Sequence, residues 1–327
     1  MNKTIFYIIL LCCMYTIKPS DCNAQHMIQP DFLKPGDVIR VVAPAGVVDP
    51  VKTKAGIALW EKQGYTLVLG KHIYDRHNRF AGTDANRLQD LQEAMNDSTC
   101  KAIVCVRGGY GSIHLVNKLD FSEFNKHPKW LIGFSDITVL HEEFQKQGYK
   151  SIHGPMVASS IVNNQPGKSF EYLMQILKGE IPTYQFLSHT LNRQSEEVEG
   201  ELIGGNLSIL YSLLGDTSLL NTNGKILFVE DLGEQLYHLD RMIYSLKQAG
   251  KLDHIKALLV GEFIDMKDTG NMNQSVEEII WNAVKEYNFP VYFNFPAGHG
   301  DNNYPLIFGE KYQLKPNEST VTLQPIN

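Results

Sequence analysis

Residues 130–140 read WLIGFSDITVL, an apolar run that stops at Gly133 and resumes two residues after Ser135. A sharp turn from a buried strand into a helix would hold Ser135 at the carboxyl edge of a sheet, with Gly133 giving the backbone room to turn. This interpretation makes Ser135 a candidate nucleophile. A helix cap at Ser135 or Asp136 explains the same residues, and Ile137 stands where the second glycine of G-x-S-x-G would be. The rest of the chain has to decide between the nucleophile elbow and the helix cap.

Short apolar runs alternate with helical patterns on both sides of this stretch. The strand-like runs cover residues 38–45, 65–70, 102–106, 130–134 and 151–154, and the helical patterns cover 51–63, 84–95 and 135–146. Such alternation of Val- and Ile-rich strands with helices is typical of a parallel sheet covered on both faces. We therefore predict an N-terminal α/β domain over residues 25–165 that carries a nucleophile elbow.

The rhythm breaks in the middle of the chain. Residues 166–197 are rich in polar and turn-forming residues and are predicted to be a linker region. A second series of strands and helices begins at Val198, and the tail from Pro305 alternates apolar and polar residues as β-strands do. The prediction is a C-terminal α/β domain over residues 198–327 that ends in β-strands, with a cleft between the two domains.

The first 24 residues have the layout of a secretory signal peptide. Lys3 precedes an apolar run from Ile5 to Met14, and Cys22-Asn23-Ala24 forms a small-x-small cleavage site. The run is shorter than the roughly 20 residues that span a bilayer. We expect an exported, periplasmic protein without a stable membrane span; whether the leader is cleaved after Ala24 or lipid-modified stays open.

The composition excludes several classes of function. With 43% hydrophobic and 20% charged residues the chain is globular, and its net charge of −6 without a basic cluster argues against a nucleic-acid partner. Outside the leader only Cys100 and Cys105 remain, and an extended strand between them would hold them roughly 16 Å apart, too far for a disulfide. No cofactor and no metal site is expected.

Chemistry-bearing residues follow four of the apolar runs. Ligands of parallel α/β sheets bind at the carboxyl ends of the strands. The glycine-rich RGGYG (107–111), Ser135, the pair Glu230-Asp231, and His299 stand at such ends. Together they would form a serine hydrolase in which His299 activates Ser135, Glu230 orients His299, and glycine amides bind the oxyanion. Taken singly, each has an ordinary alternative as a turn, a helix cap or a surface loop.

Eight ordered stretches decide between these interpretations. They are LKPGDVIRVVAPAG (33–46), FAGTDANRLQDLQEAM (80–95), VRGGYG (106–111), LIGFSDIT (131–138), HGPM (153–156), GELIGGNLSIL (200–210), FVEDLGE (228–234) and GHGDNNYPLIFG (298–309). This series resembles the LD-carboxypeptidase family of serine peptidases, which includes muramoyl-tetrapeptide carboxypeptidases and microcin C self-immunity peptidases. The match runs from about Pro30 to Leu323.

The resemblance implies a role for each matching residue. Ser135, Glu230 and His299 would be nucleophile, acid and base, and the amides of Gly109 and Asp136 would bind the oxyanion. Substrate contacts would come from Gly108, Tyr110 and the amide of Asn206. The implied reaction is hydrolysis, without metal or cofactor, of the bond that joins a C-terminal D-alanine to an L-configured centre of a murein tetrapeptide.

Two other functions stay open from the sequence alone. A related serine peptidase could cleave another amide, such as that of an aminoacyl-nucleotide. An exported muropeptide-binding protein would also have two α/β lobes around a cleft, but a receptor has no need for Ser, Glu and His at three strand ends. The oligomeric state is also open, with a homodimer as one alternative.

Overall fold

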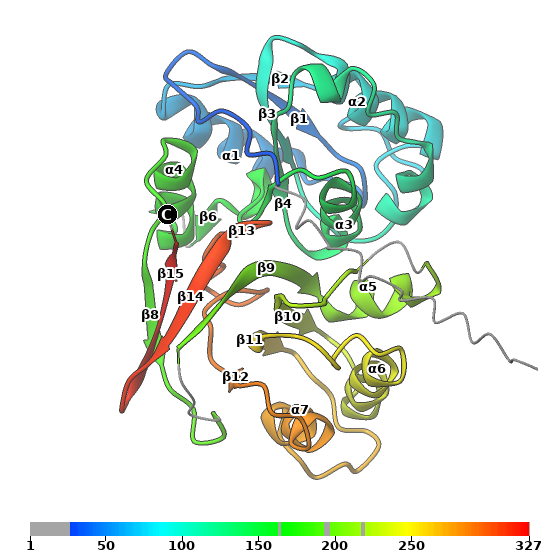
Figure 1. The fold of residues 1–327 in the computed structure, drawn as a ribbon. Helices are drawn as coiled ribbons and strands as arrows, with labels where there is room; N and C mark the ends of the chain where they lie inside the picture. The colour runs from blue at the N-terminus through cyan, green and yellow to red at the C-terminus, as the bar shows by residue number, and fades with distance from the viewer. Residues whose placement is uncertain (1–26, 163–164, 193–196, 217–219, 327) are drawn as a thin grey trace, which may run out of the picture.

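Two α/β lobes make up the molecule (Figure 1). The computed structural model describes residues 27–162, 165–192, 197–216 and 220–326, so the predicted signal peptide lies outside the described residues. Within these ranges, no helix combines the length and the apolar character that crossing a membrane requires.

The N-terminal lobe is built on a six-stranded sheet with the order β13-β5-β4-β3-β1-β2. Strands β1 to β5 are parallel, and β13 pairs antiparallel with β5 at one edge. The bounds are β1 Val38–Val42, β2 Thr66–Leu69, β3 Cys100–Cys105, β4 Trp130–Gly133, β5 Ser151–His153 and β13 Leu306–Phe308. Cys100 and Cys105 are buried free thiols at the two ends of β3.

Helices cover both faces of this sheet, as the strand-helix alternation predicts. Residues of α1 and α4 pack into the core on one face, and residues of α2 and α3 into the core on the other. The helices are α1 Pro50–Lys62, α2 Asp84–Asn96, α3 Thr138–Lys146 and α4 Lys168–Leu177. Both helices that follow β1 and β2 start with a side-chain cap, Asp49 for α1 and Thr83 for α2.

The C-terminal lobe has a seven-stranded sheet with the order β12-β11-β10-β9-β14-β15-β8. Strands β9 to β12 are parallel, and β14, β15 and β8 continue the sheet antiparallel. The strands are β8 Tyr184–Leu187, β9 Val198–Asn206, β10 Ile226–Leu232, β11 Ala257–Ile264, β12 Val291–Tyr292, β14 Lys311–Pro316 and β15 Thr320–Pro325; the helices are α5 Leu207–Ser212, α6 Leu236–Gln248 and α7 Val276–Val284. The three helices share one apolar core on a single face.

The chain passes between the lobes more than once. In the segment predicted as a linker, α4 packs into the N-terminal core while β8 joins the C-terminal sheet. A two-stranded ribbon, β6 Ile161–Val162 with β7 Gln165–Pro166, precedes α4. Strand β13 then returns from the C-terminal lobe to the edge of the N-terminal sheet (Figure 1). The linker region therefore contributes to both domains.

Candidate active site

Ser135 is the first residue of a single 3₁₀ turn, η4 (Ser135–Ile137), which connects β4 to α3. Its φ angle is 65°, in the left-handed region that non-glycine residues seldom adopt. A Cβ on Gly133 would lie 2.9 Å from Ile137 Cγ1, so the turn needs glycine there. Neither η4 nor α3 has a side-chain cap. The geometry is that of a nucleophile elbow, and the simple helix cap is not what forms.

Glu230 and His299 form a buried hydrogen-bonded pair. Glu230 lies in β10, and His299 lies in the loop between β12 and β13; Glu230 Oε2 and His299 Nδ1 are 2.7 Å apart. The Glu230 side chain is fully buried and that of His299 is 13% exposed. Gly298, with φ of 147°, brings the loop this close, because a Cβ there would lie 3.2 Å from Glu230 Oε2.

The surroundings of His299 favour its protonated form. Burial disfavours the imidazolium, but the hydrogen bond and negative charge of Glu230, with the charge of Asp231, outweigh it and raise the pKa of His299 above the ordinary 6.5. A carboxylate at Nδ1 also fixes the neutral tautomer, with the proton on Nδ1 and the lone pair on Nε2. The pair therefore presents a basic nitrogen on the side away from Glu230.

The structure brings the elbow next to this pair through Phe134. The ring of Phe134, the residue before Ser135, lies 4.8 Å from the ring of His299, centroid to centroid. No hydrogen bond joins Ser135 and His299, both of which are described. Catalytic hydrogen bonds often form only in the substrate complex. Glu230 and His299 thus meet directly, while Ser135 and His299 are neighbours.

Residues 107–111, which we call the oxyanion loop, pack against the nucleophile. A Cβ on Gly108 would lie 2.9 Å from Ser135 Cβ and 3.3 Å from the Asp136 nitrogen. The Gly108 carbonyl accepts a hydrogen bond from the Gly46 N–H at 3.2 Å. Because C=O and N–H point in opposite directions across a trans peptide, the Gly109 N–H points away from Gly46. Within the described residues, the N–H groups of Gly109 and Asp136 have no acceptor.

Asp231 and Asn206 bond to each other behind the site. Asp231 accepts hydrogen bonds from the Asn206 side-chain amide and the Ser208 N–H, both at 2.9 Å, and thereby caps α5. Burial and the charge of Glu230 raise the pKa of Asp231 to about 7. The Asn206 main-chain N–H donates to Thr138 Oγ1 at 3.0 Å. Both amides of Asn206 are thus engaged inside the protein, and a substrate contact through them stays a prediction.

A cavity of about 180 Å³ opens beside His299. Its wall combines residues from 155–160 and 167–170 with the loop 298–303, and it includes Phe134, Ser160, Ser169 and Asp301. The sequence interpretation missed Ser160 and Ser169, although residues 155–160 follow β5 at the same carboxyl edge of the sheet as Ser135. Tyr110 lies elsewhere, on the exposed side of the oxyanion loop, where its hydroxyl is 3.3 Å from His114 Nε2.

No cluster of three or more His, Cys, Asp or Glu side chains in the described ranges is arranged to hold a metal ion. The polar groups gathered at the elbow are the hydroxyl of Ser135, the imidazole of His299 with its carboxylate, and the two backbone N–H groups of Gly109 and Asp136. This set can carry out nucleophilic acyl transfer, with the base beside the nucleophile and two donors for a developing oxyanion.

Comparisons with known proteins agree with this arrangement. The sequence models of the LD-carboxypeptidase N-terminal and C-terminal domains match residues 39–154 and 199–314. A Bacillus subtilis protein named "Probable murein peptide carboxypeptidase" is 34% identical over 304 residues, covering 90% of this chain and 94% of its own. The murein tetrapeptide carboxypeptidase of Pseudomonas aeruginosa is 32% identical over 292 residues, covering 85% and 93%.

Solved structures match over the same range. The muramoyltetrapeptide carboxypeptidase from Oxalobacter formigenes superposes with a TM-score of 0.81 at 28% identity, over 89% of this chain and 99% of its own. The microcin C7 self-immunity protein MccF shares the fold, with a TM-score of 0.80 at 21% identity over 91% and 98% of the two chains. Both domain models, the relatives and the elbow geometry agree: this chain belongs to the LD-carboxypeptidase family of serine peptidases.

Proposed function

We propose that this protein is a serine carboxypeptidase that releases the C-terminal D-alanine from murein tetrapeptides. The observation that carries the proposal is the buried Glu230–His299 pair, 2.7 Å apart, beside the strained Ser135 elbow. The names of the relatives from P. aeruginosa and O. formigenes support the substrate class. The cavity next to His299 supports a peptide substrate, because both lobes contribute to its wall.

In the proposed reaction, His299 Nε2 takes the proton of the Ser135 hydroxyl as the oxygen attacks the carbonyl carbon that precedes D-alanine. Glu230 stabilises the imidazolium that forms. The oxyanion of the tetrahedral intermediate lies between the N–H groups of Gly109 and Asp136. His299 then gives its proton to the nitrogen of the leaving D-alanine, and a water molecule hydrolyses the acyl-enzyme by the same route.

The test uses the protein without residues 1–24 and two substrates that differ in one stereocentre. A murein tetrapeptide that ends in D-alanine and its counterpart that ends in L-alanine are incubated separately, and alanine release is followed by mass spectrometry. We expect release from the first and at least a tenfold lower rate from the second. Release from neither, with cleavage of an aminoacyl-nucleotide amide instead, would overturn the substrate assignment in favour of the other amide hydrolase.

We also propose that the protein is exported to the periplasm, where intact murein peptides are found. The apolar run from Ile5 to Met14 and the small-x-small site that ends at Ala24 support this. Mass analysis of the protein from its native host should give a chain that starts at Gln25. An intact Met1, or a lipid on Cys22, would contradict cleavage after Ala24. Light scattering of the same preparation tests the homodimer.

A further inference from the structure

We propose that Arg87 is a positioning residue that holds the oxyanion loop in its active geometry. The inference rests on the proposed function, because it assigns a role in the same acyl-transfer site. Arg87 lies in α2 and its side chain is fully buried, with 0% exposure. An arginine in such a place has to recover the cost of desolvating its charge through several well-placed acceptors. Arg87 has three acceptors. Two are backbone carbonyls in loops near the site, and the third is a carboxylate in its own helix, α2.

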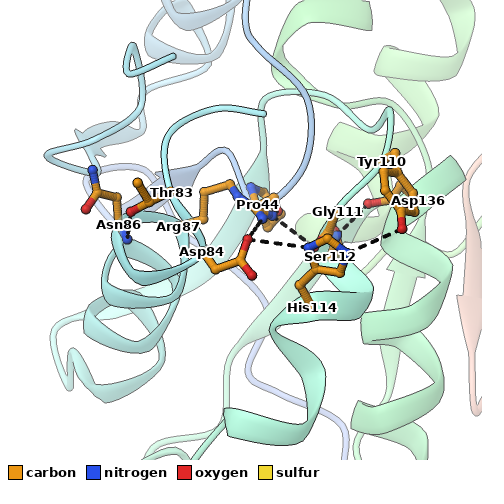
Figure 2. Close-up of polar contacts among 10 residues, drawn as sticks. All are labelled: Pro44, Thr83, Asp84, Asn86, Arg87, Tyr110, Gly111, Ser112, His114 and Asp136. Carbon is orange, nitrogen blue, oxygen red and sulfur yellow. Dashed lines mark hydrogen bonds and ion pairs between the residues drawn. The ribbon is translucent and has the colours of Figure 1, made fainter. Parts of the chain in front are cut away.

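Figure 2 shows how the guanidinium joins these segments. Arg87 Nη1 donates to the carbonyl of Gly111, at the end of the oxyanion loop, at 2.9 Å. The same nitrogen donates to the carbonyl of Pro44, in the loop after β1. Nη2 pairs with Asp84 Oδ1 at 2.5 Å, and the ring of Phe80 lies 5.0 Å from the guanidinium carbon. The guanidinium is thus fixed on several sides, and one of its nitrogens bridges two loops.

Those two loops enclose the peptide that carries the Gly109 N–H. The segment that begins at Pro44 continues to Gly46, whose N–H donates to the Gly108 carbonyl, and a Cβ on Gly109 would lie 3.3 Å from Gly46 Cα. At the far end, Gly111 has a φ of 132°, and a Cβ there would lie 2.8 Å from Arg87 Nη1. Arg87 therefore ties the oxyanion loop to the segment 44–46. That segment, through the bond from Gly46 to the Gly108 carbonyl, sets the direction of the Gly109 N–H.

A second tie connects the same loop to the elbow. Asp136, the residue after the nucleophile, accepts a hydrogen bond from the Ser112 N–H at 2.8 Å (Figure 2). Arg87 bonds to the carbonyl of Gly111, and Asp136 bonds to the N–H of the next residue, Ser112. The two hydrogen bonds that hold this end of the loop are therefore on adjacent residues. Preorganised donors are effective because no reorganisation is needed when charge develops on the substrate oxygen. Loosening Arg87 should therefore raise the energy of the transition state more than that of the bound substrate.

The test is the substitution Arg87→Lys, with Arg87→Met beside it. Lysine keeps the charge but cannot reach both carbonyls and Asp84 with a rigid fork. We expect kcat for D-alanine release to fall by about 10²-fold, similar to the loss of one oxyanion donor, with KM changed less than threefold. The control is Arg40→Met, since Arg40 is partly buried in the same domain and pairs with Asp97 away from the oxyanion loop. That variant should keep wild-type kcat.

A readout without the natural substrate separates this proposal from the assigned function. A fluorophosphonate labels an activated serine when its oxygen displaces fluoride from phosphorus, and the phosphoryl oxygen then occupies the oxyanion site. We expect labelling of Ser135 in the wild type and about 10²-fold slower labelling in Arg87→Lys, whichever peptide the enzyme cleaves. Normal labelling of folded Arg87→Lys would overturn the positioning role. Failed D-alanine release with normal wild-type labelling would count only against the substrate.

If Arg87→Met does not fold, two other experiments still test the positioning role: the variant Asp84→Asn and chemical rescue of Arg87→Ala. Asp84→Asn weakens the ion pair that orients Arg87 and leaves the buried carbonyl contacts in place, so labelling should slow several-fold. Methylguanidinium added to Arg87→Ala should restore part of the labelling rate, because it can occupy the vacated position. A purely structural Arg87 predicts a lower melting temperature for these variants with an unchanged labelling rate per folded molecule, and that result would overturn the proposal.

Discussion

Glu230 Oε2 lies 2.7 Å from His299 Nδ1, where the C-terminal lobe faces Phe134 of the N-terminal lobe. Glu230 is in β10, and the loop that carries His299 is anchored by the Glu262 N–H, which donates to the Ala297 carbonyl at 2.8 Å, and by the Gly298 N–H, which donates to the Asn303 side-chain oxygen Oδ1 at 3.2 Å. The bond to Glu230 orients the imidazole, and its Nε2 is the nitrogen left for chemistry.

Replacing Glu230 by Gln should nearly abolish turnover. The amide keeps the volume of the carboxylate but can present an N–H to the ring, which favours the wrong tautomer and removes the charge that stabilises the imidazolium. By analogy with the Asp-to-Asn change in another serine triad, we expect kcat to fall on the order of 10⁴-fold with KM little changed. Steady-state kinetics of D-alanine release provides the measurement.

The neighbouring acid is the matched control. Asp231 accepts hydrogen bonds from Asn206 and from the start of α5, so Asp231→Asn should lower stability by about 1–3 kcal/mol and leave kcat within a few-fold of wild type. Melting temperature and kcat are measured for both variants. If Asp231→Asn is inactive while Glu230→Gln turns over normally, the acid of the triad has been assigned to the wrong residue.

Ser135→Ala should remove activity and keep the fold. The Ser135 side chain makes no hydrogen bond within the described residues, so alanine removes the nucleophile without removing a contact that stabilises the chain. We expect a loss of about 10³-fold or more in kcat and a melting temperature close to wild type. Ser245→Ala on α6 serves as the control with normal activity. Activity that survives Ser135→Ala and is lost with a chelator would indicate a metal-dependent mechanism.

The pH profile should reflect the raised pKa of His299. The base works only when neutral, so kcat/KM should rise with pH through a midpoint above 6.5, the ordinary histidine value. The linked effect on stability has the opposite direction: the proton on His299 stabilises the fold below the unfolded pKa, and this contribution is lost as the pH rises through the folded pKa.

NMR titration of the imidazoles checks the assignment directly. His141 is an internal reference, because burial lowers its pKa to about 4. We expect His299 to titrate above 6.5 in the wild type and at lower pH in Glu230→Gln, while His141 stays neutral in both. A wild-type His299 that titrates at or below 6.5 would contradict the electrostatic account of the pair.

Gly108→Ala should slow catalysis, because its methyl group would occupy space beside the nucleophile. The added methyl would lie 2.9 Å from Ser135 Cβ and 3.3 Å from the Asp136 nitrogen, where the substrate oxygen should bind. We expect kcat/KM to fall by at least 10²-fold. Gly215→Ala is the control, since a Cβ there meets no atom within 4 Å. Equal activity of the two variants would show that the oxyanion site lies elsewhere.

The fold was largely predictable because its pattern is local. Buried parallel strands such as β3 and β4 are nearly continuous apolar runs, and helices such as α2 carry the expected periodicity. The segment 166–197 was harder, because α4 and β8 are stabilised by packing against distant partners and the surrounding residues look like turns. Strand β13 reads as one of several terminal strands, and nothing in its sequence tells which sheet it joins.

Part of the candidate site could also be predicted from the sequence. Strand ends pointed to Ser135, Glu230 and His299, and the structure brings the last two into contact. Arg87 was missed, although it stands on the same helical face as the buried Leu91 and Ala94, where a charged residue is out of place. A charged residue on the buried face of α2 indicates that it has hydrogen-bond acceptors inside the protein. The two bonds of Asn206 could not be predicted, because the one to Thr138 depends on how the two lobes meet and the one to Asp231 depends on the pairing of β9 with β10.

The return of β13 to the N-terminal sheet means that neither lobe is a separable part. A fragment that stops before Leu306 would leave β5 as a bare edge with unpaired main-chain groups, which invites association with other chains. The lobes cannot swing apart in the manner of a hinged receptor without breaking this strand pairing, since only the short turn at Gly309 and Glu310 separates β13 from β14 in the other sheet. Thermal unfolding should accordingly show one cooperative transition, and truncation at residue 305 should yield aggregated material.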